Sequence, residues 1–460
     1  MTSFRRFNRG LISRYDVAGP RYTSYPTAAD FQSPFAHSEL VSAIERGNVR
    51  QDPLSIYVHI PFCESLCFYC GCSKVVTRKR SRADEYLYYL AKEIAYYGKL
   101  FDPGRQVDQL HWGGGTPTFL THAQMSMLMD LLREHFNFAS DDVGEFSIEI
   151  DPRRVTPETI HYLREIGFNR LSMGVQDFDV EVQQAINRVQ PIEMTSQALM
   201  AAREAGFQSV SFDLIYGLPK QRLSTFRETL DKVVELSPDR ISLFNYAHMP
   251  HLIRAQLAIN EEDLPGPETK LDLLELSKHV LEEAGYVSIG MDHFAKPQDE
   301  LAKALANNKL HRNFQGYTTH KDHDMLGLGV TSISQIAGCF AQNNKTLDNY
   351  YREVSRAGHA TVRGIALNDE DMIRAAVIND LSCERGVDFE MFFKTFGEPF
   401  ETYFSYELDK LGPFIEDGLV SLSKSGLAVT EMGKILLRPI CMVFDAYRQS
   451  DKQIRFSRVI

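Results

Sequence analysis

The sequence lacks the features that mark membrane-spanning and secreted proteins. No stretch of its 460 residues approaches the roughly 18 consecutive apolar residues that a membrane-spanning helix requires. Arg5, Arg6 and Arg9 stand near the start, but no apolar run follows them as it would in a secretory signal. We therefore expect a soluble protein of the cytoplasm.

An excess of positive charge is also missing. The chain has 50 Lys and Arg against 61 Asp and Glu, a net charge of −11, whereas binding to nucleic acid depends on clustered cations. Hydrophobic residues make up 43% and charged residues 24% of the chain. These are the proportions of globular proteins, and they exclude a disordered, collagenous or coiled-coil chain. We expect neither nucleic acid nor a membrane as a partner.

Cysteine is scarce outside one short segment. Of the seven cysteines, Cys339, Cys383 and Cys441 are scattered and are most simply buried apolar side chains. The other four fall within ten residues, at positions 63, 67, 70 and 72. The odd total and the missing export signal argue against a disulfide framework. This group of four is therefore the feature that most needs a functional explanation.

Between about residues 55 and 297, short β-rich runs alternate with helical patterns, which is typical of βα units. Three helix ends, Gly167-Phe168, Gly206-Phe207 and Gly285-Tyr286, lead directly into expected strands, and each glycine can adopt the left-handed cap. This repetition predicts an α/β fold with a partial or complete TIM-like barrel. The expected strands are 55–61, 107–112, 145–151, 170–175, 209–215, 240–245 and 286–291.

We expect four parts: an N-terminal segment that covers the barrel (1–54), the barrel with the cysteine loop (55–297), loops that close the active site (298–365) and a mainly helical C-terminal domain (366–460). The third part is assigned to loops because 311–319 and 325–338 are rich in glycine, polar and aromatic residues. The C-terminal domain carries one hairpin pattern at 416–430. A winged-helix-like unit is therefore an alternative to a helical domain that packs on the barrel.

The cysteine segment follows the first expected strand, at the end where the active site of an α/β barrel lies. Cys63, Cys67 and Cys70 have the spacing C-x3-C-x2-C. Three thiolates on one loop suit three irons of a [4Fe–4S] cluster and leave the fourth iron open for chemistry. A zinc site usually takes two separated ligand pairs, and no second pair stands out downstream. The spacing favours the cluster over zinc and over unconnected buried cysteines.

Further features lie at or near the ends of later strands. Gly113-Gly114-Gly115 ends the second strand and would let the chain pass close to a ligand. Glu149 and Asp213 are carboxylates within apolar strands, where an ionised group is unfavourable unless it is paired or binds a ligand. A tight turn and ion pairs within the barrel are the structural alternatives.

This combination resembles the radical S-adenosylmethionine (SAM) enzymes, whose cluster loop has an aromatic residue, here Tyr69, before the last cysteine. Within that class, the chain is similar to the oxygen-independent coproporphyrinogen III oxidase (dehydrogenase) family. The similarity spans nearly the whole chain, and it is carried by RYTSYPT at 21–27, YVHIPFC at 57–63, CGC at 70–72, HWGGGTPT at 111–118, SMGVQDF at 172–178, HRNFQGY at 311–317 and FSRVI at 456–460.

The resemblance implies that Cys63, Cys67 and Cys70 bind a [4Fe–4S] cluster and that SAM binds its fourth iron. Reduction of the cluster would then yield a 5′-deoxyadenosyl radical. The family is also expected to hold a second SAM molecule. The implied contacts are Tyr57, Gly114, Glu149 and Ile333 for the first SAM, and Tyr69, Gly115, Thr116, Gln176, Arg188, Asp213 and Ala247 for the second.

The implied reaction is the oxidative decarboxylation of coproporphyrinogen III to protoporphyrinogen IX in anaerobic haem and porphyrin biosynthesis, with two propionates becoming vinyl groups. This substrate is a tetracarboxylate with four pyrrole NH groups, so its site should offer cations and hydrogen-bond donors around an apolar cavity. The candidate residues are Arg21, Tyr22, Tyr25, His311, Arg312 and Gln315, with Arg458 as a further one. A low-potential electron donor such as flavodoxin or ferredoxin is implied, and we expect a monomer.

Three alternatives remain open. A relative with the same cysteine loop could carry haem as a chaperone, but such relatives usually lack both the cysteine at position 72 and the 21–27 type of segment. Another relative could open or methylate haem by radical chemistry. A protein with a purely structural iron–sulfur cluster is the alternative from a different class.

Overall fold

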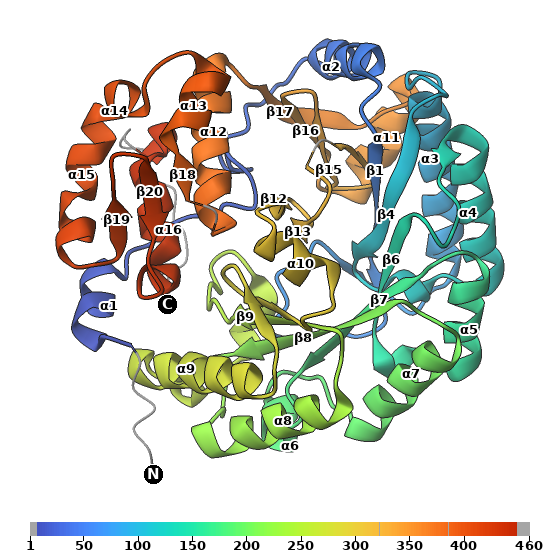
Figure 1. The fold of residues 1–460 in the computed structure, drawn as a ribbon. Coiled ribbons are helices and arrows are strands. Elements are labelled where there is room, and N and C mark those ends of the chain that lie inside the picture. The colour runs from blue at the N-terminus through green and yellow to red at the C-terminus, as the bar shows by residue number, and fades with distance from the viewer. Residues whose placement is uncertain (1–6, 322, 385, 449–460) are drawn as a thin grey trace.

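The computed structural model describes residues 7–321, 323–384 and 386–448 (Figure 1). At its centre is one large sheet with the strand order β10-β11-β9-β8-β7-β6-β4-β1-β14-β15-β16-β17, and β5 (Asn137–Phe138) pairs with β4. The strands from β9 to β14 in this order are parallel. They are β1 (Leu54–Ile60), β4 (Gln106–Gly114), β6 (Glu145–Ile150), β7 (Arg170–Gln176), β8 (Ser209–Tyr216), β9 (Arg240–Asn245) and β14 (Asp324–Leu328).

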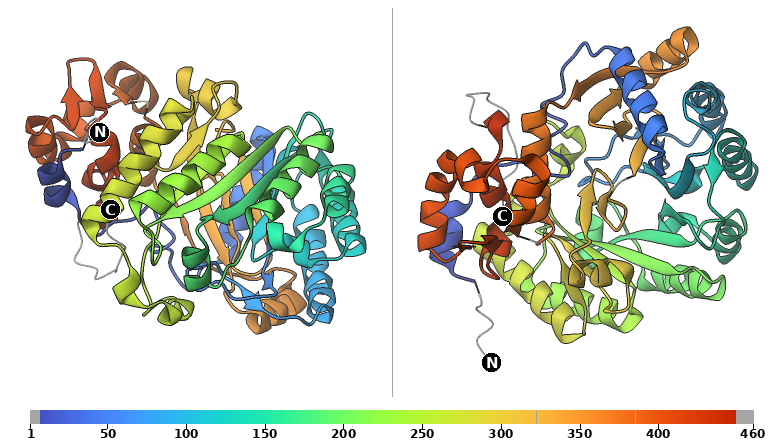
Figure 2. Two further views of the ribbon diagram at one scale, coloured as in Figure 1. Left: turned by 90° about the horizontal axis from the view of Figure 1, so that it is seen from below. Right: turned by 45° about the horizontal axis from the view of Figure 1, so that its top comes forward.

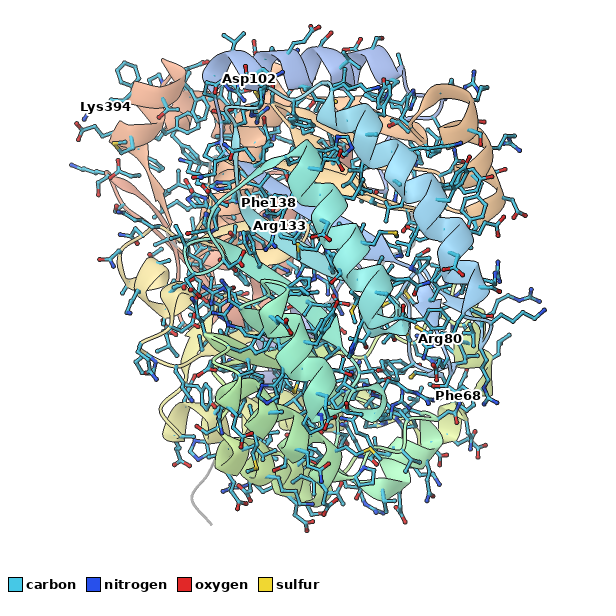
Figure 3. The ribbon with its side chains drawn as sticks, turned by 90° about the vertical axis from the view of Figure 1, so that its right-hand side faces the viewer. Phe68, Arg80, Asp102, Arg133, Phe138 and Lys394 are labelled. Carbon is cyan, nitrogen blue, oxygen red and sulfur yellow. The ribbon has the colours of Figure 1, made fainter. Side chains whose placement is uncertain are left out.

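Within the described residues the two end strands of this sheet do not pair with each other, so the expected TIM-like barrel is partial. Helices cover the outside of the arc, and Figure 3 views it from the side that α3 and α4 cover. The outward faces of the strands and the inward faces of the helices form one apolar core that includes the fully buried Trp112, Phe146 and Phe212. The covering helices are α3 (Ser81–Gly98), α4 (His122–His135), α5 (Pro157–Glu165), α7 (Ile192–Glu204), α8 (Leu223–Leu236) and α9 (Pro267–Glu283).

The helix ends confirm the expected left-handed glycine caps. Gly167, Gly206 and Gly285 follow α5, α7 and α9 with φ angles of +112°, +81° and +85°. The aromatic residue after each of them is buried: Phe168, Phe207 and Tyr286. These repeated junctions place the start of the next strand against the end of the preceding helix.

Two strand predictions were wrong. The segment expected as a seventh parallel strand, 286–291, holds β10 (Val287–Ile289), which forms an antiparallel hairpin with β11 (His293–Ala295). The seventh parallel strand is instead β14, inside the stretch assigned to loops, and β15 (Ile333–Ile336) follows it in the sheet. The sequence conceals β14 because Gly327 interrupts its short apolar run. A Cβ on Gly327 would lie 2.4 Å from the Ile333 carbonyl oxygen, so packing requires glycine there.

The rest of 298–365 also contains regular structure. After α10 (Glu300–Ala306), β12 (His311–Asn313) and β13 (Gly316–Thr318) form a separate hairpin. The strands β16 (Cys339–Asn343) and β17 (Thr361–Ala366) extend the central sheet, with α11 (Leu347–Ala357) between them. The segment 298–365 was expected to consist of loops that close the active site. Because most of it forms helices and strands of the central sheet, the parts that can close a site are the β12–β13 hairpin and the turns between the strands.

The C-terminal part is a compact unit with its own apolar core. Its predicted hairpin is confirmed as β19 (Val420–Leu422) and β20 (Gly426–Val429), and β18 (Val387–Asp388) adds a third strand. In the part of the chain that the structure describes, five helices surround this small sheet: α12 (Asp369–Ser382), α13 (Phe389–Phe396), α14 (Phe400–Tyr403), α15 (Ser405–Glu416) and α16 (Leu437–Val443).

The N-terminal segment belongs to both parts of the molecule. Its first helix, α1 (Arg9–Tyr15), lies against the C-terminal unit, and both views of Figure 2 show this contact. Tyr15, Tyr22 and Tyr25 are members of the C-terminal core. The chain then crosses to α2 (His37–Arg50), whose buried face joins the barrel core. The segment therefore links the two cores as well as covering the barrel.

None of the helices in the described residues combines the length and apolar character needed to cross a membrane. The candidate residue Arg458 and the FSRVI motif lie outside the described residues.

Candidate functional site

The cysteine loop is closed by a pair of two-residue strands. β2 (Phe62–Cys63) pairs with β3 (Val75–Val76), and the Thr77 amide donates to the Cys63 carbonyl oxygen over 2.8 Å. The loop is also anchored to the barrel, because the Phe68 amide donates to the Ile186 carbonyl oxygen at the end of α6 (Val180–Ala185). These contacts fix the loop at the carboxyl ends of the parallel strands, as predicted.

Polar groups are directed at the sulfur atoms of the loop. The Thr116 hydroxyl lies 3.6 Å from Cys63 Sγ, and guanidinium nitrogens of Arg188 and Arg153 each lie 3.7 Å from Cys67 Sγ. All described cysteines are free thiols. Donors and cations stabilise thiolate sulfur. The surroundings of the loop therefore suit an anionic thiolate-bound cluster.

The three cysteines of the loop do not have to meet at one point in order to bind a cluster. In a cubane cluster each thiolate binds a different iron, and no three His, Cys, Asp or Glu side chains of the described residues are grouped as ligands of one ion. The donor set on the loop thus fits the predicted cluster.

A cavity of about 650 Å³ opens beside the loop, within the range typical of small-molecule sites. It runs along the inside of the strands, and the N-terminal segment and the β12–β13 hairpin contribute to its wall. Most of the predicted site residues line it: Cys63, Cys67, Cys70, Tyr69, Gly114, Gly115, Thr116, Glu149, Gln176, Arg188, Asp213, Ala247, Arg21 and Gln315.

Glu149 faces this cavity from β6, with 42% of its side chain exposed. It accepts a hydrogen bond from the Gly114 amide over 3.1 Å, and His111 Nε2 lies 3.3 Å from its other oxygen. Enclosure by protein raises the pKa of Glu149, but these partners outweigh that effect and hold the pKa below its ordinary value. Glu149 is therefore an anion that is ready to accept a cationic or hydroxyl group.

Asp213 faces the same cavity from β8, with an opposite pKa shift. Burial and, to a lesser degree, the nearby charge of Glu149 raise its pKa to about 6, although the Ser172 hydroxyl donates to it over 3.1 Å. The two carboxylates thus differ in how easily they take up a proton.

The glycine run has a packing role besides any ligand contact. A Cβ on Gly115 would lie 2.7 Å from the Phe62 carbonyl oxygen, and one on Gly114 would lie 2.5 Å from the His59 ring. Gly114 also has a φ of +113°, which disfavours other residues. The sequence predicted that these glycines let the chain pass close to a ligand. In the structure they first of all let the end of β4 lie close to the end of β1, which carries the cysteine loop.

Asp151 is the last residue of the expected strand 145–151, and it organises the arginines beside Cys67. It pairs with Arg153 over 2.7 Å and with Arg188 over 3.4 Å. Burial raises the pKa of Asp151, but the two guanidinium groups more than offset this and keep it ionised. Arg153 was not among the predicted site residues. Its position two residues after a strand end is the signal that could have found it.

Six predicted contacts do not line this cavity. Tyr57 is enclosed behind it, with its hydroxyl 3.0 Å from His59 Nδ1, and Ile333 packs in a small apolar cluster with Phe31 and Phe340. Arg312 lines a smaller cavity, described below. The others are Tyr22, Tyr25 and His311.

Tyr22 and Tyr25 need correction as substrate candidates. Both are buried in the C-terminal core, where the Tyr22 hydroxyl donates to Asp445 over 2.8 Å and the Tyr25 hydroxyl accepts from the Ala446 amide over 3.1 Å. Their motif fixes the N-terminal segment in place, and Arg21 is the member of it that reaches the cavity.

Comparison with known families agrees with this geometry. Residues 57–233 match the family model of the radical SAM superfamily, and residues 367–436 match the HemN C-terminal domain. The fold and the site define a radical SAM enzyme. The superfamily implies a [4Fe–4S] cluster and SAM as cofactors, which the residues of the loop fit.

The similarity to characterised proteins extends over almost the whole chain. It is 51% identical over 451 residues to the oxygen-independent coproporphyrinogen III oxidase of Escherichia coli strain K12, covering 98% of each chain. The protein of that name from Pseudomonas aeruginosa is 47% identical over 455 residues, covering 99% of each. The solved structure of coproporphyrinogen III oxidase (HemN) from Escherichia coli has a TM-score of 0.92 and 49% identity, covering 96% of this chain and 99% of that one. The chain belongs to the oxygen-independent coproporphyrinogen III oxidase family.

Proposed function

We propose that this chain converts coproporphyrinogen III to protoporphyrinogen IX by oxidative decarboxylation of two propionates. The observation that carries the proposal is that the cysteine loop and two of the predicted substrate contacts, Arg21 and Gln315, line one cavity. The predicted cluster ligands and the predicted substrate contacts thus face one cavity, and exclusion of water from such a space protects reactive intermediates. Membership of the family supports the same reaction.

When bound, the cluster and SAM would supply a radical able to take a β-hydrogen atom from a propionate; loss of CO₂ and transfer of one electron to an external one-electron acceptor would then leave the vinyl group. The protein's own part is to hold the reactants. Glu149 offers a carboxylate to the cofactor nearest the loop, Arg188 and Arg153 balance the negative charge at Cys67, and Arg21 attracts a substrate carboxylate. Gln315 contributes an amide to the same wall.

The proposal includes a second SAM molecule. Its support is the breadth of the cavity, because Asp213, Gln176 and Ala247 line it from strands and turns other than those that carry Gly114 and Glu149. Gln176 ends β7 with a φ of +69°, a conformation that a side chain adopts at some energetic cost and that often accompanies a functional role. Equilibrium dialysis with labelled SAM should give two molecules per chain of reconstituted protein.

The cluster ligands can be tested one at a time. Cys63→Ala, Cys67→Ala and Cys70→Ala should each lose most of the iron and the electron paramagnetic resonance signal of the reduced cluster. Cys72→Ala should keep both, because the C-x3-C-x2-C loop needs no fourth cysteine. Cys339→Ala, a change in the buried β16, is the matched control for loss of an unrelated thiol. Loss of the cluster in Cys72→Ala would contradict the ligand assignment.

The activity itself is tested under anaerobic conditions with reconstituted protein, reductant, SAM and coproporphyrinogen III. We expect protoporphyrinogen IX and CO₂, and no product from the three ligand variants. Tight haem binding by the wild-type protein without turnover would instead support the chaperone alternative.

We further propose that the electron donor is an acidic protein of the flavodoxin or ferredoxin kind. The segment that follows the cysteine loop carries Lys74, Arg78, Lys79, Arg80 and Arg82, and three of these are exposed. Arg80 pairs with Glu64 inside the loop, so the segment lies directly beside the proposed cluster. Figure 3 labels Arg80 and Phe68 at the same edge of the molecule. In a chain of net charge −11, such a cationic face suits a negatively charged partner.

Reversing two of these charges should lower turnover with a protein reductant and leave turnover with a chemical reductant unchanged. Arg78→Glu with Lys79→Glu should reduce flavodoxin-supported turnover about tenfold, through slower association, while dithionite-supported turnover stays unchanged. Equal loss with both reductants would contradict a docking role. We also propose that the protein acts as a monomer in the cytoplasm, which sedimentation and cell fractionation would test.

A further inference from the structure

A second, smaller cavity of about 80 Å³ shares Arg21 and Asn245 with the wall of the larger one. Distant parts of the chain build it: the N-terminal segment, the ends of β8 and β9, α9, the β10–β11 turn, the β12–β13 hairpin and the start of α16 with the short helix η5 (Gly433–Leu436). Its charged residues are Arg21, Lys278, Arg312, Lys434, Arg438 and Asp292.

The charges around this cavity are strongly unbalanced. Five cations face one carboxylate, and Asp292 is already paired with His293 over 2.6 Å. The charge of Lys434 is balanced by two carboxylates that do not line the cavity, since Lys434 pairs with Glu384 over 2.8 Å and with Glu431 over 2.6 Å. The remaining cations still outnumber the acid. This local excess favours an anionic ligand.

Arg312 shows most directly that a hydrogen-bond acceptor is missing. Its side chain is 4% exposed, and its guanidinium lies over the Tyr317 ring, 4.7 Å from the ring centre. Nη1 is 3.9 Å from Asp292, which is too far for a hydrogen bond, and neither Nε nor Nη1 has a partner among the described residues. Leaving a buried charged donor unsatisfied costs about 1–3 kcal/mol or more, so these two atoms indicate an acceptor that arrives with a ligand.

The pKa of Arg438 also reflects the excess of positive charge around this cavity. It is buried, and it donates to the carbonyl oxygens of Gly19 and Pro20, which hold the N-terminal segment against α16. Burial lowers its pKa to about 10, and the charge of Arg21 contributes to the lowering. An anion in the cavity would relieve this repulsion.

We propose that the smaller cavity is a carboxylate subsite, which holds one propionate of the substrate while another propionate of the same molecule reaches the larger cavity. The inference rests on the proposed function, and it adds the residues that would recognise the carboxylates of the substrate. A space of about 80 Å³ holds a group of a few heavy atoms, such as a carboxylate with its methylene groups, but not the whole porphyrinogen ring system. Arginine suits this role, because its fork of donors matches a carboxylate.

The subsite gives the C-terminal unit a part in substrate recognition. Lys434 and Arg438 come from that unit, whereas Lys278 and Asp292 come from the barrel. A porphyrinogen bound across both cavities would be held by its substituents at a distance from the reacting carbon. Such remote contacts fix the position of the reacting group.

The test compares two porphyrins that share a ring system, coproporphyrin III with four carboxylates and etioporphyrin III with none. Their affinities are measured by fluorescence titration of anaerobic, cluster-loaded protein. Lys278→Gln should weaken coproporphyrin III binding about tenfold, equivalent to about 1.4 kcal/mol, and change etioporphyrin III binding less than twofold. Arg312→Gln should show the same selective loss more strongly. Iron content and SAM binding should stay at wild-type levels in both.

Lys394→Gln is the matched control, because Lys394 projects from the edge of the C-terminal unit on α13, as Figure 3 shows. It should bind both porphyrins as the wild type does. Equal losses for the two porphyrins, or no loss in either cavity variant, would overturn the carboxylate subsite while wild-type turnover upheld the proposed function. Failure of the wild-type protein to convert coproporphyrinogen III would overturn both.

Discussion

At the scale of single residues, the pKa values of two carboxylates in the larger cavity, Glu149 and Asp213, are shifted in opposite directions. Glu149 keeps a pKa below its ordinary value because His111 and Gly114 offset its burial, whereas burial and the charge of Glu149 raise the pKa of Asp213 to about 6. The difference arises from the partners of each group, since the hydroxyl groups of Ser172 and Ser242 lower the pKa of Asp213 by less than its burial raises it. Such separated pairs are frequent in functional sites.

Asp213 should therefore make cofactor binding depend on pH. SAM carries a positive sulfonium and an ammonium group, so its binding near Asp213 should weaken by about tenfold per pH unit below pH 6, as the carboxylate takes up a proton. Above that pH the affinity should be constant. Asp213→Asn should remove the dependence and lower the number of bound SAM molecules. Isothermal titration between pH 5 and 8 measures both, and an unchanged pH profile in the variant would contradict the role.

Motifs in the sequence predicted many of these residues, because cysteine spacing, strand ends and in-strand carboxylates follow chemical rules that apply locally. They could not reveal that Tyr22 and Tyr25 are buried, since tyrosine suits both a core and a substrate site. Nor could they find the cavity around Arg312 and Arg438, whose members come from distant parts of the chain.

At the scale of elements, the junction between β1 and β4 holds the cysteine loop in place. The Gly115 amide donates to the Ile60 carbonyl oxygen and the Thr116 amide to that of Phe62, each over 2.8 Å. The ends of β1 and β4 therefore lie so close together that there is no room for a side chain at Gly115.

Gly115→Ala should consequently disturb the loop. The new Cβ would meet backbone atoms of Pro61 and Phe62 at 2.7 Å, and we expect a loss of stability of about 1–3 kcal/mol together with reduced iron content. Gly412→Ala is the control, because its Cβ meets nothing within 4 Å, and alanine inside α15 should stabilise the protein by about 0.5–1 kcal/mol. Thermal melts and iron assays measure both. Full iron loading in Gly115→Ala would contradict this view of the junction.

The alternation of strands and helices was visible in the sequence as far as β9, because each unit repeats the same pattern of buried strand, capped helix and glycine. Beyond β9 the pattern fails. β14 has five residues, of which the fourth is a glycine, and its place in the parallel sheet depends on pairing with β1, about 270 residues earlier in the chain.

At the scale of the whole molecule, one buried carboxylic acid links helices to the edge of the sheet. Glu93 on α3 accepts hydrogen bonds from the Gly329 amide, the Asn343 side chain and the Tyr350 hydroxyl, each over 2.7 Å. Burial nevertheless raises its pKa to about 7.

Stability should therefore fall as Glu93 ionises. The folded-state pKa lies above the ordinary value of 4.5, so the folded protein binds this proton more tightly than the unfolded chain does. The contribution is complete below about pH 4.5 and is lost as the pH rises through 7, a change of about 3 kcal/mol. Glu93→Gln should flatten that part of the profile, which urea unfolding at pH 5 and pH 7.5 would measure. Identical slopes in both proteins would contradict the assignment.

The crossing of the N-terminal segment into the C-terminal core has a consequence for biosynthesis. Tyr15, Tyr22 and Tyr25 are translated before the barrel, yet the residues they pack against, such as Ile440 and Phe444, are translated long after it. Domains usually fold in the order of their synthesis, but this core has to wait until the C-terminal unit has been synthesised. Arg21, which both cavities share, waits with it. Synthesis of the C-terminal unit, rather than emergence of the cysteine loop, is thus the event that assembles the substrate site.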